Sequence, residues 1–242
     1  PYQKQGLNWL AFITGLGLGG CLADDMGLGK TIQILALLLK KQKQSLPSLL
    51  IVPASLLGNW RKEAERFAPS LRLTFLHPGH QERSEIDKIA KKPKESLAET
   101  DLCITTYSML SRQEWLREIK WQHVILDEAQ AIKNPATRQT KAVKKLQSVS
   151  RLALTGTPIE NKLDDLWSIF DFINPGLLGS VSVFKKFINR LQGQEVCQFA
   201  PLQQLVQPYI LRRLKTDRSV ISDLPDKVEM VSYCNLSKQQ IK

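Results

Sequence analysis

The stretch "LADDMGLGKTIQ", Leu22 to Gln33, is the part of the sequence that says most about the architecture. It nearly matches G-x-x-x-x-G-K-[ST], the pattern of a phosphate-binding loop, but Asp24 stands where the first glycine is expected. The two remaining glycines, Gly27 and Gly29, still let backbone N–H groups approach a phosphate closely. The stretch therefore predicts a nucleotide site even though one glycine of the pattern is missing.

The residues after the loop supply the charge that such a site needs. Apolar positions at Ile32, Leu35 and Leu38 have helical spacing, so a helix is expected to begin near Lys30 and to direct its amino-terminal dipole at the phosphate. The Lys30 ammonium would lie between the β- and γ-phosphates, and the Thr31 hydroxyl would bind Mg²⁺. By itself the short glycine loop is a moderate signal, because such loops also occur in ordinary turns.

A second motif, "VILDEA", strengthens the prediction. Four apolar or small residues surround two acids, so Asp127 and Glu128 are expected at the carboxyl edge of a buried strand that neighbours the loop strand. Asp127 fits the Mg²⁺ role, and Glu128 is placed to polarise an attacking water. An ordinary acidic loop is the alternative for an Asp-Glu pair alone, and the pairing with the phosphate loop disfavours it.

Apolar runs alternate with helical patterns through the first two thirds of the chain, which predicts an α/β fold with a mainly parallel sheet flanked by helices. Expected strands cover 19–23, 48–52, 71–76, 101–106, 123–129 and 151–156, and expected helices cover 55–67 and 135–147. The lysine-rich stretch 88–94 is interpreted as a solvated loop. We expect the domains 1–162, a lobe; 163–211, a helical protrusion; and 212–242, a return segment and linker.

Composition restricts the partners. The chain has 242 residues, with 34 Lys and Arg against 23 Asp and Glu, and a net charge of +11, which favours a polyanion such as nucleic acid. No apolar run is long enough to span a membrane, and the four cysteines form no C-x-x-C pair. The chain begins at Pro1, so we expect a segment of a longer protein.

Seven segments in order carry a resemblance to a known family. They resemble the amino-terminal RecA-like lobe of Swi/Snf-type DNA-translocating ATPases of helicase superfamily two, and the match covers nearly the whole chain. In that family an acidic pair commonly opens the phosphate motif, so Asp24 is a family trait; Asp25 departs from the more usual glutamate. The segments are "YQKQGLNWL", "LADDMGLGKTIQ", "LIVPASLLGNW", "CITTYSML", "LDEAQAIKNP", "LALTGTPIENKLDDLWSIFDFINPGLLG" and "LRRLKTD".

The resemblance implies ATP and Mg²⁺ as cofactors, and it implies residue roles. Lys30, Asp127 and Glu128 would be catalytic, with Thr31 and Asp127 at the metal. The nucleotide would be held by Gln3, which would read adenine, and by Asp25, Met26, Gly27, Leu28, Gly29, Lys30 and Thr31. Coupling of nucleotide state to DNA would involve Gln130, Thr155, Gly156 and Thr157. The DNA groove would be lined by Pro53, Ala54, Ser55, Thr105 and Thr106.

Several of these positions could instead have a purely structural role. Gln3 could be a solvated helix residue, and the threonine pair 105–106 could simply cap a strand. Arg138, Lys141 and Lys145 are spaced to lie on one face of a helix. We interpret this face as solvated, and the alternative is a basic stripe that faces DNA. The aromatic side chains near residue 170 have helical spacing and are expected in the core.

As a whole, the resemblance implies a lobe that pulls its parent along double-stranded DNA and remodels DNA-bound proteins. Hydrolysis would require the second RecA-like lobe of the same chain, so this segment alone is expected to be nearly inactive. We expect a cytoplasmic, nucleoid-associated protein in a bacterium or a nuclear one in a eukaryote. Two rivals stay open: a nucleotide-gated DNA clamp without turnover, and an RNA helicase lobe.

Overall fold

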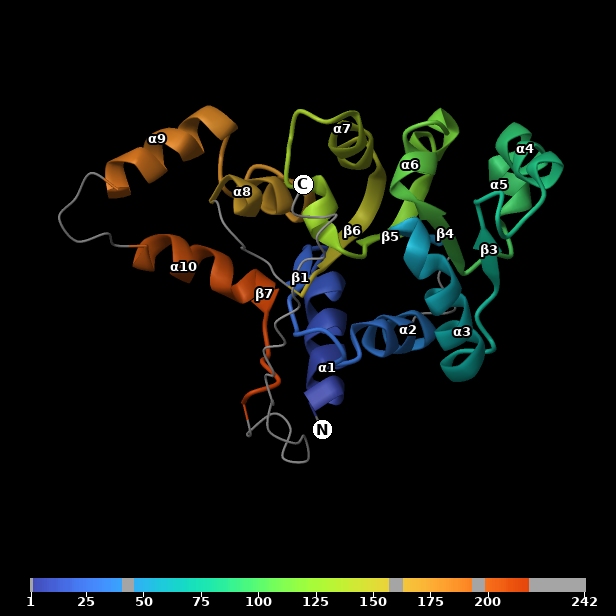
Figure 1. Cartoon of the computed structure of the whole chain (residues 1–242), viewed down its shortest axis with the longest axis horizontal. Coiled ribbons are helices and arrows are strands. Elements are labelled where there is room, and N and C mark those ends of the chain that lie inside the picture. Colours follow the sequence, from blue (N-terminus) through green and yellow to red (C-terminus); the bar gives the residue numbers. More distant parts are fainter. Residues whose placement is uncertain (1, 41–45, 157–162, 193–198, 218–242) are drawn as a thin grey trace, which may run out of the picture.

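The computed structural model describes residues 2–40, 46–156, 163–192 and 199–217. Its centre is a seven-stranded parallel sheet with strand order β3-β4-β2-β5-β6-β1-β7 (Figure 1). The strands are β1 Gly20–Leu22, β2 Ser48–Val52, β3 Leu73–Phe75, β4 Leu102–Thr106, β5 Lys120–Leu126, β6 Gln147–Leu154 and β7 Ile210–Leu211.

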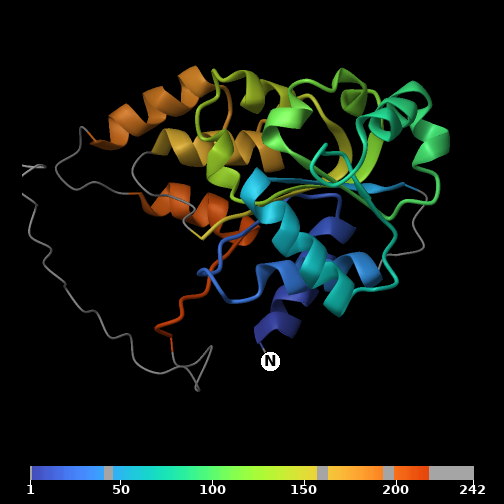
Figure 2. The same ribbon diagram turned by 45° about the vertical axis from the view of Figure 1, so that its right-hand side comes forward.

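Two apolar layers cover the sheet because alternate strand residues point to opposite faces. On β2, Leu50 and Val52 pack with helices α1, α2 and α3, whereas Leu49 and Ile51 pack with helices α6, α7 and α8. Figures 1 and 2 show the two layers on opposite sides of the sheet. The first layer is formed by α1 Tyr2–Gly15, α2 Lys30–Lys40 and α3 Leu57–Phe67; the second includes α6 Tyr107–Leu110, α7 Arg138–Lys144 and α8 Leu163–Ile173.

The predicted α/β class and parallel sheet are confirmed, and every expected strand is present. One loop prediction and one helix boundary differ from the structure. Stretch 88–94 is not a loop: it falls in α4 Arg83–Lys91 and α5 Pro93–Ser96, because Ile86 and Ile89 are buried on one face of α4. Helix α7 begins at Arg138 rather than at residue 135, because the Thr137 side chain accepts a hydrogen bond from the Thr140 N–H and caps it.

The region predicted as a helical protrusion contains α8, α9 Val181–Gln192 and α10 Ala200–Val206. Helix α8 packs against β6, and its Trp167, Phe170 and Phe172 are buried, which confirms core packing of these aromatic residues. Helices α9 and α10 lie to one side of the sheet in Figure 1. The last two residues of the region form β7, a strand that the sequence did not predict. They join the sheet through parallel pairing with Cys21 and Leu22.

Short 3₁₀ turns link several elements and two of them bear on the site: η1 Ala54–Leu56 leads into α3, and η3 Ala129–Ile132 follows the acid pair after β5. The others are η2 Glu114–Arg117 and η4 Gln207–Tyr209. In the part of the chain that the structure describes, no helix is long and apolar enough to cross a membrane.

Candidate nucleotide site

The phosphate loop has the backbone that its glycines predict. Gly27 and Gly29 have φ values of 82° and 74°, in the left-handed region that favours glycine. Helix α2 begins at Lys30, directly after the loop. The Lys30 ammonium donates to the Asp24 backbone oxygen at 2.7 Å, so its side chain already curls over the loop. It has further hydrogens to offer to a phosphate.

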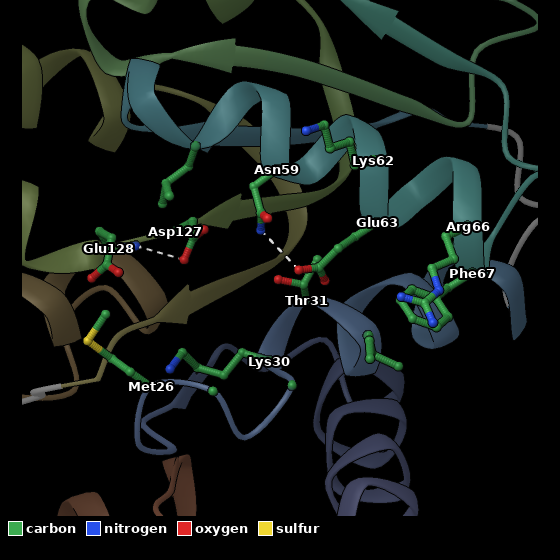
Figure 3. A pocket seen from close by; sticks show the side chains of 14 residues that line it. Met26, Lys30, Thr31, Asn59, Lys62, Glu63, Arg66, Phe67, Asp127 and Glu128 are labelled. Atoms are coloured by element: carbon green, nitrogen blue, oxygen red, sulfur yellow. Dashed lines mark hydrogen bonds between the residues drawn. The ribbon is translucent and has the colours of Figure 1, made fainter.

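A cavity of about 620 Å³ lies between this loop, α3 and the end of β5 (Figure 3). In Figure 3, Lys30 and Met26 lie on one side, and Asp127 and Glu128 lie on another. The predicted loop, lysine, metal and acid residues therefore meet at one place. The residues lining the cavity are Met26, Gly27, Gly29, Lys30, Thr31, Ile32, Leu56, Asn59, Lys62, Glu63, Arg66, Phe67, Asp127 and Glu128.

Asp127 is held rigidly. One carboxylate oxygen accepts from the Trp60 indole N–H at 2.7 Å, and the other accepts from the Glu128 backbone N–H at 3.0 Å. The Tyr107 hydroxyl donates to the Asp127 backbone oxygen at 2.8 Å. Burial raises the pKa of Asp127 above its usual value and Glu128 adds to this, while the hydrogen bond from Trp60 opposes the shift.

Glu128 has a φ of 50°, the one non-glycine positive φ among the described residues. A left-handed conformation costs free energy for such a residue, and such strain tends to be kept where function needs it. Its carboxylate accepts from the Gln130 amide at 2.6 Å, and the Gln130 oxygen accepts from the Thr155 hydroxyl at 3.0 Å. The turn thus aims Glu128 into a chain of hydrogen bonds.

The sequence predicts that the acids follow the strand next to the loop strand. This prediction is wrong, because β6 lies between β5, which precedes the acids, and β1, which precedes the loop. This places Thr155 and Gly156, which follow β6, between the acids and the loop. The Thr155 N–H donates to the Leu22 oxygen at 3.2 Å, and a Cβ on Gly156 would stand 3.1 Å from the Met26 side chain. Together, the predicted coupling positions Gln130, Thr155 and Gly156 therefore contact both the acid pair and the phosphate loop. Thr157 lies outside the described residues.

The oxygen ligands fit Mg²⁺. Thr31 and Asp127 both line the cavity, and hydroxyl and carboxylate oxygens are ligands that this hard cation prefers. The fixed orientation of the Asp127 carboxylate by Trp60 is the kind of support that metal ligands usually have. Burial lowers the pKa of Lys30, an effect opposed by Glu128, Asp127, Asp24 and Asp25, so the lysine lies in the field of the acids.

The remaining predicted nucleotide residues surround the loop. The Gln3 amide nitrogen would lie 2.5 Å from a Cβ placed on Gly29, so the amino-terminal end of α1 touches the loop. Leu28 is buried in the core, which leaves only its backbone for a phosphate. Asp25 uses one carboxylate oxygen to accept from the Lys215 N–H at 2.9 Å. The adenine-reading role of Gln3 stays a prediction.

The predicted DNA-groove residues lie at the ends of β2 and β4. Ala54 and Ser55 are exposed and Pro53 is half-buried. Thr105 and Thr106 are buried: the Thr105 hydroxyl donates to the Leu76 oxygen at 3.3 Å, and the Thr106 hydroxyl caps α6 by accepting from the Met109 N–H at 3.3 Å. The two threonines have the contacts that the capping alternative requires, and their contact with DNA stays a prediction.

Sequence reasoning missed two groups of residues. Helix α3 lines the cavity with Asn59, Lys62, Glu63, Arg66 and Phe67, and the Arg66 guanidinium lies 4.9 Å from the Phe67 ring centre. Their helical spacing was visible, but only the packing of α3 shows which face meets the loop. The second is a pairing: Arg213 and Asp24 are far apart in the sequence, and no sequence pattern predicts the ion pair that they form.

A phosphate loop and an acid pair at the carboxyl edge of one parallel sheet define a P-loop, RecA-like nucleotide site. Residues 2–242 match the SNF2-related domain family. The chain belongs to that family.

Solved structures and curated relatives support the same family. The SWI2/SNF2 ATPase core of Sulfolobus solfataricus in complex with dsDNA is 48% identical, with a TM-score of 0.82, over 99% of this chain and 49% of that one. A putative ATP-dependent helicase/translocase, YwqA of Bacillus subtilis, is 43% identical over 99% of this chain and 26% of its own length. A human SWI/SNF-related regulator of chromatin, subfamily A member 1, is 36% identical over 99% of this chain and 23% of its own. The chain thus spans about a quarter of these two curated relatives.

Proposed function

We propose that this chain is the ATP-binding lobe of a double-stranded DNA translocase that remodels protein–DNA complexes. The observation that carries the proposal is the meeting of Lys30, Thr31, Asp127 and Glu128 around one cavity. This set suits phosphoryl transfer, in which positioning and charge stabilisation supply most of the catalysis. The dsDNA in the Sulfolobus relative supports duplex DNA as the partner.

In this proposal each residue has one task. The Lys30 ammonium binds the β- and γ-phosphates, and Thr31 and Asp127 hold Mg²⁺, which neutralises phosphate charge when bound. The Glu128 carboxylate orients and polarises the attacking water. Gln130, Thr155 and Gly156 report the state of the nucleotide to the DNA groove, and Gln3 reads the adenine edge.

Substitution of the catalytic pair tests the proposal in the parent protein that carries both lobes. Glu128→Gln should retain ATP binding and lower turnover by roughly 10²–10⁴-fold, because an amide cannot polarise water as a carboxylate does. Lys30→Ala should weaken ATP binding itself. Turnover is read as released phosphate and binding as the Kd of a fluorescent ADP analogue. Lys88→Ala, which changes an exposed lysine of α4 outside the cavity lining, is the matched lysine control. Unchanged turnover in Glu128→Gln would remove Glu128 from this role and favour the clamp.

We further propose that the isolated lobe is nearly inactive. The transition state needs positive charge on the γ-phosphate beyond Lys30, and in the resembling family arginines of the second lobe provide it. An arginine of this kind is worth on the order of 10³–10⁵ in rate. Phosphate release by this chain should therefore fall far below that of the two-lobed parent. Comparable rates would show that catalysis is completed within one lobe.

Contact with DNA should be independent of sequence, since the proposed groove offers hydroxyls and backbone groups to phosphates. Each phosphate neutralised should add about 0.9 to the log–log salt slope with duplex DNA. Titration of two unrelated DNA duplexes and one RNA duplex at several salt concentrations measures this. Preference for one DNA sequence would contradict backbone tracking, and tighter binding of RNA would favour an RNA helicase lobe.

A further inference from the structure

A short segment far along the chain runs beside the phosphate loop. The Ala23 N–H donates to the Leu211 oxygen at 2.7 Å, and the Asp25 N–H donates to the Arg213 oxygen at 3.0 Å. The Lys215 N–H then donates to the Asp25 carboxylate. Residues 211–215, hereafter the return strap, thus extend the β1–β7 pairing beyond the strands and along the first half of the loop.

The strap buries one arginine against Asp24 of the phosphate loop. The Arg213 guanidinium forms a two-pronged ion pair with Asp24: Nε donates to Oδ1 at 2.9 Å, and Nη2 donates to Oδ2. Arg213 is 8% exposed and Asp24 is fully buried. A buried carboxylate needs such a partner, because charge removed from water is otherwise strongly unfavourable. The residue that replaces the first glycine of the motif is therefore an anchor for the strap.

The same guanidinium reaches two more elements. Its Nη2 donates to the Gln33 side-chain oxygen of α2 at 2.8 Å, and its Nη1 donates to the backbone oxygen of Tyr2. The Gln33 amide in turn donates to Asp24 at 3.2 Å. Tyr2 precedes Gln3, whose amide lies against Gly29. Arg213 thus joins the start of α1, the phosphate loop and the first turn of α2.

Helix α1 leaves room for this cluster. A Cβ on Gly6 would stand 1.7 Å from the Gln33 side-chain oxygen and 2.8 Å from an Arg213 nitrogen. Glycine within a helix costs about 1 kcal/mol relative to alanine. The absence of a side chain at Gly6 lets α1 lie directly on the Arg213–Gln33 contact.

We propose that Arg213 is a positioning residue for the nucleotide, which sets the distance between the adenine-reading end of α1 and the phosphate loop. It does not touch the nucleotide. Because its planar fork binds Asp24, Gln33 and Tyr2 together, it fixes Gln3 and Gly29 relative to one another. The inference deepens the proposed function and depends on it, since it takes the cavity as an adenine nucleotide site.

The test compares Arg213→Gln with Arg212→Gln, in which the neighbouring exposed arginine is changed in the same way. For each variant the Kd values of ADP and GDP are measured by competition with a fluorescent ADP analogue, together with the midpoint of thermal unfolding. We expect ADP to bind about tenfold more weakly to Arg213→Gln, the effect of losing one or two good hydrogen bonds. GDP should lose less, so the preference for adenine should shrink. Arg212→Gln should match the wild type.

Two further variants keep the test decisive if Arg213→Gln does not fold. Arg213→Lys retains the charge beside Asp24 but cannot reach Tyr2 and Gln33 at the same time, so adenine preference should still fall. Gly6→Ala disturbs the cluster from α1 without altering charge, and it raises helix propensity, so weaker binding would not come from a weaker helix.

The outcomes separate the two claims. Wild-type protein that binds no ADP would refute the proposed adenine nucleotide site itself. If the wild type binds ADP but Arg213→Lys and Gly6→Ala keep full adenine preference, Arg213 is not a positioning residue. An equal loss for ADP and GDP would likewise overturn the inference, because a purely structural role predicts no change in base preference.

Discussion

The two halves of the site are held in different ways. The acid half is fixed by side chains of the buried core: Asp127 is oriented by Trp60 of α3, by Tyr107 of α6 and by the next backbone N–H. The phosphate-loop half is held from a distance. Its anchor, Asp24, is bound by Arg213, 189 residues further along the chain.

This difference has a functional consequence. The acids follow a central strand between two apolar layers, so their geometry is part of the core. The loop follows β1, whose outer neighbour is the two-residue edge strand β7. Local opening at an edge costs less free energy than opening at the centre. The phosphate loop is therefore the half of the site whose geometry can respond to a movement of the return strap.

The largest effect in this comparison is expected from loss of the indole contact to the acids. Trp60→Phe removes the hydrogen bond to Asp127 and should weaken Mg²⁺ binding in the presence of ADP by about 10–100-fold, the usual range for a partner of a metal ligand. Isothermal titration calorimetry with Mg²⁺ in the presence of ADP measures this affinity. Trp121→Phe, near the start of the same strand β5, is the matched control, since its indole N–H donates to the Leu116 oxygen rather than to a residue of the site. Equal losses in both variants would mean that the acid half does not depend on Trp60.

A glycine comparison examines the loop half. Gly27→Ala and Gly176→Ala both force alanine into a left-handed backbone, with φ values of 82° and 87°, so each should lose about 1–2 kcal/mol of stability. Only Gly27→Ala lies at the loop, where the new methyl group would also meet the Lys215 ammonium. We expect about tenfold weaker ADP binding for Gly27→Ala alone, measured by fluorescence titration. Equal affinities in the two variants would contradict close approach of the loop backbone to phosphate.

The acid half should also impose a pH dependence. The pKa of Asp127 is raised in the folded protein, and only its ionised form binds Mg²⁺ well. The stabilisation by Mg²⁺ with ADP should therefore be full above the raised pKa. It should be lost as pH falls through that value, before an ordinary aspartate would protonate. Thermal midpoints with and without Mg²⁺ at stepped pH measure this, and a curve that fades only near pH 4 would contradict the shift.

The smallest effect concerns two buried thiols. Burial raises the pKa of Cys21 to about 12 and that of Cys103 further still, so neither should react with iodoacetamide at pH 8 in the folded protein. Cys21 lies on β1, beside the two-residue edge strand β7, and Cys103 lies on β4, beside the three-residue edge strand β3. On long incubation, read by mass spectrometry, Cys21 should be labelled first. Faster labelling of Cys103 would contradict the expectation that the sheet opens most easily at its β7 edge.

Much of this could be predicted from the sequence because its determinants are local. Glycine-permitted turns, a helix start at Lys30 and acids after an apolar run depend on neighbouring residues. They identified the fold class and the loop, lysine and acid residues of the cavity, but not its α3 residues. Most expected strands came within a few residues of their bounds. The prediction failed at β7, since two residues form a strand only when β1 is beside them.

Strand order and long-range pairing were decided by the tertiary structure. No local pattern indicates that β6 separates the acids from the loop, and this insertion is what brings Thr155 and Gly156 against both halves. Nor does any pattern pair Asp24 with Arg213. Which groups could bind a phosphate and a metal was already evident from the sequence, because that capacity depends on residue type. Only the fold could bring Arg213 to Asp24, because burying one charge requires an opposite charge from another part of the chain.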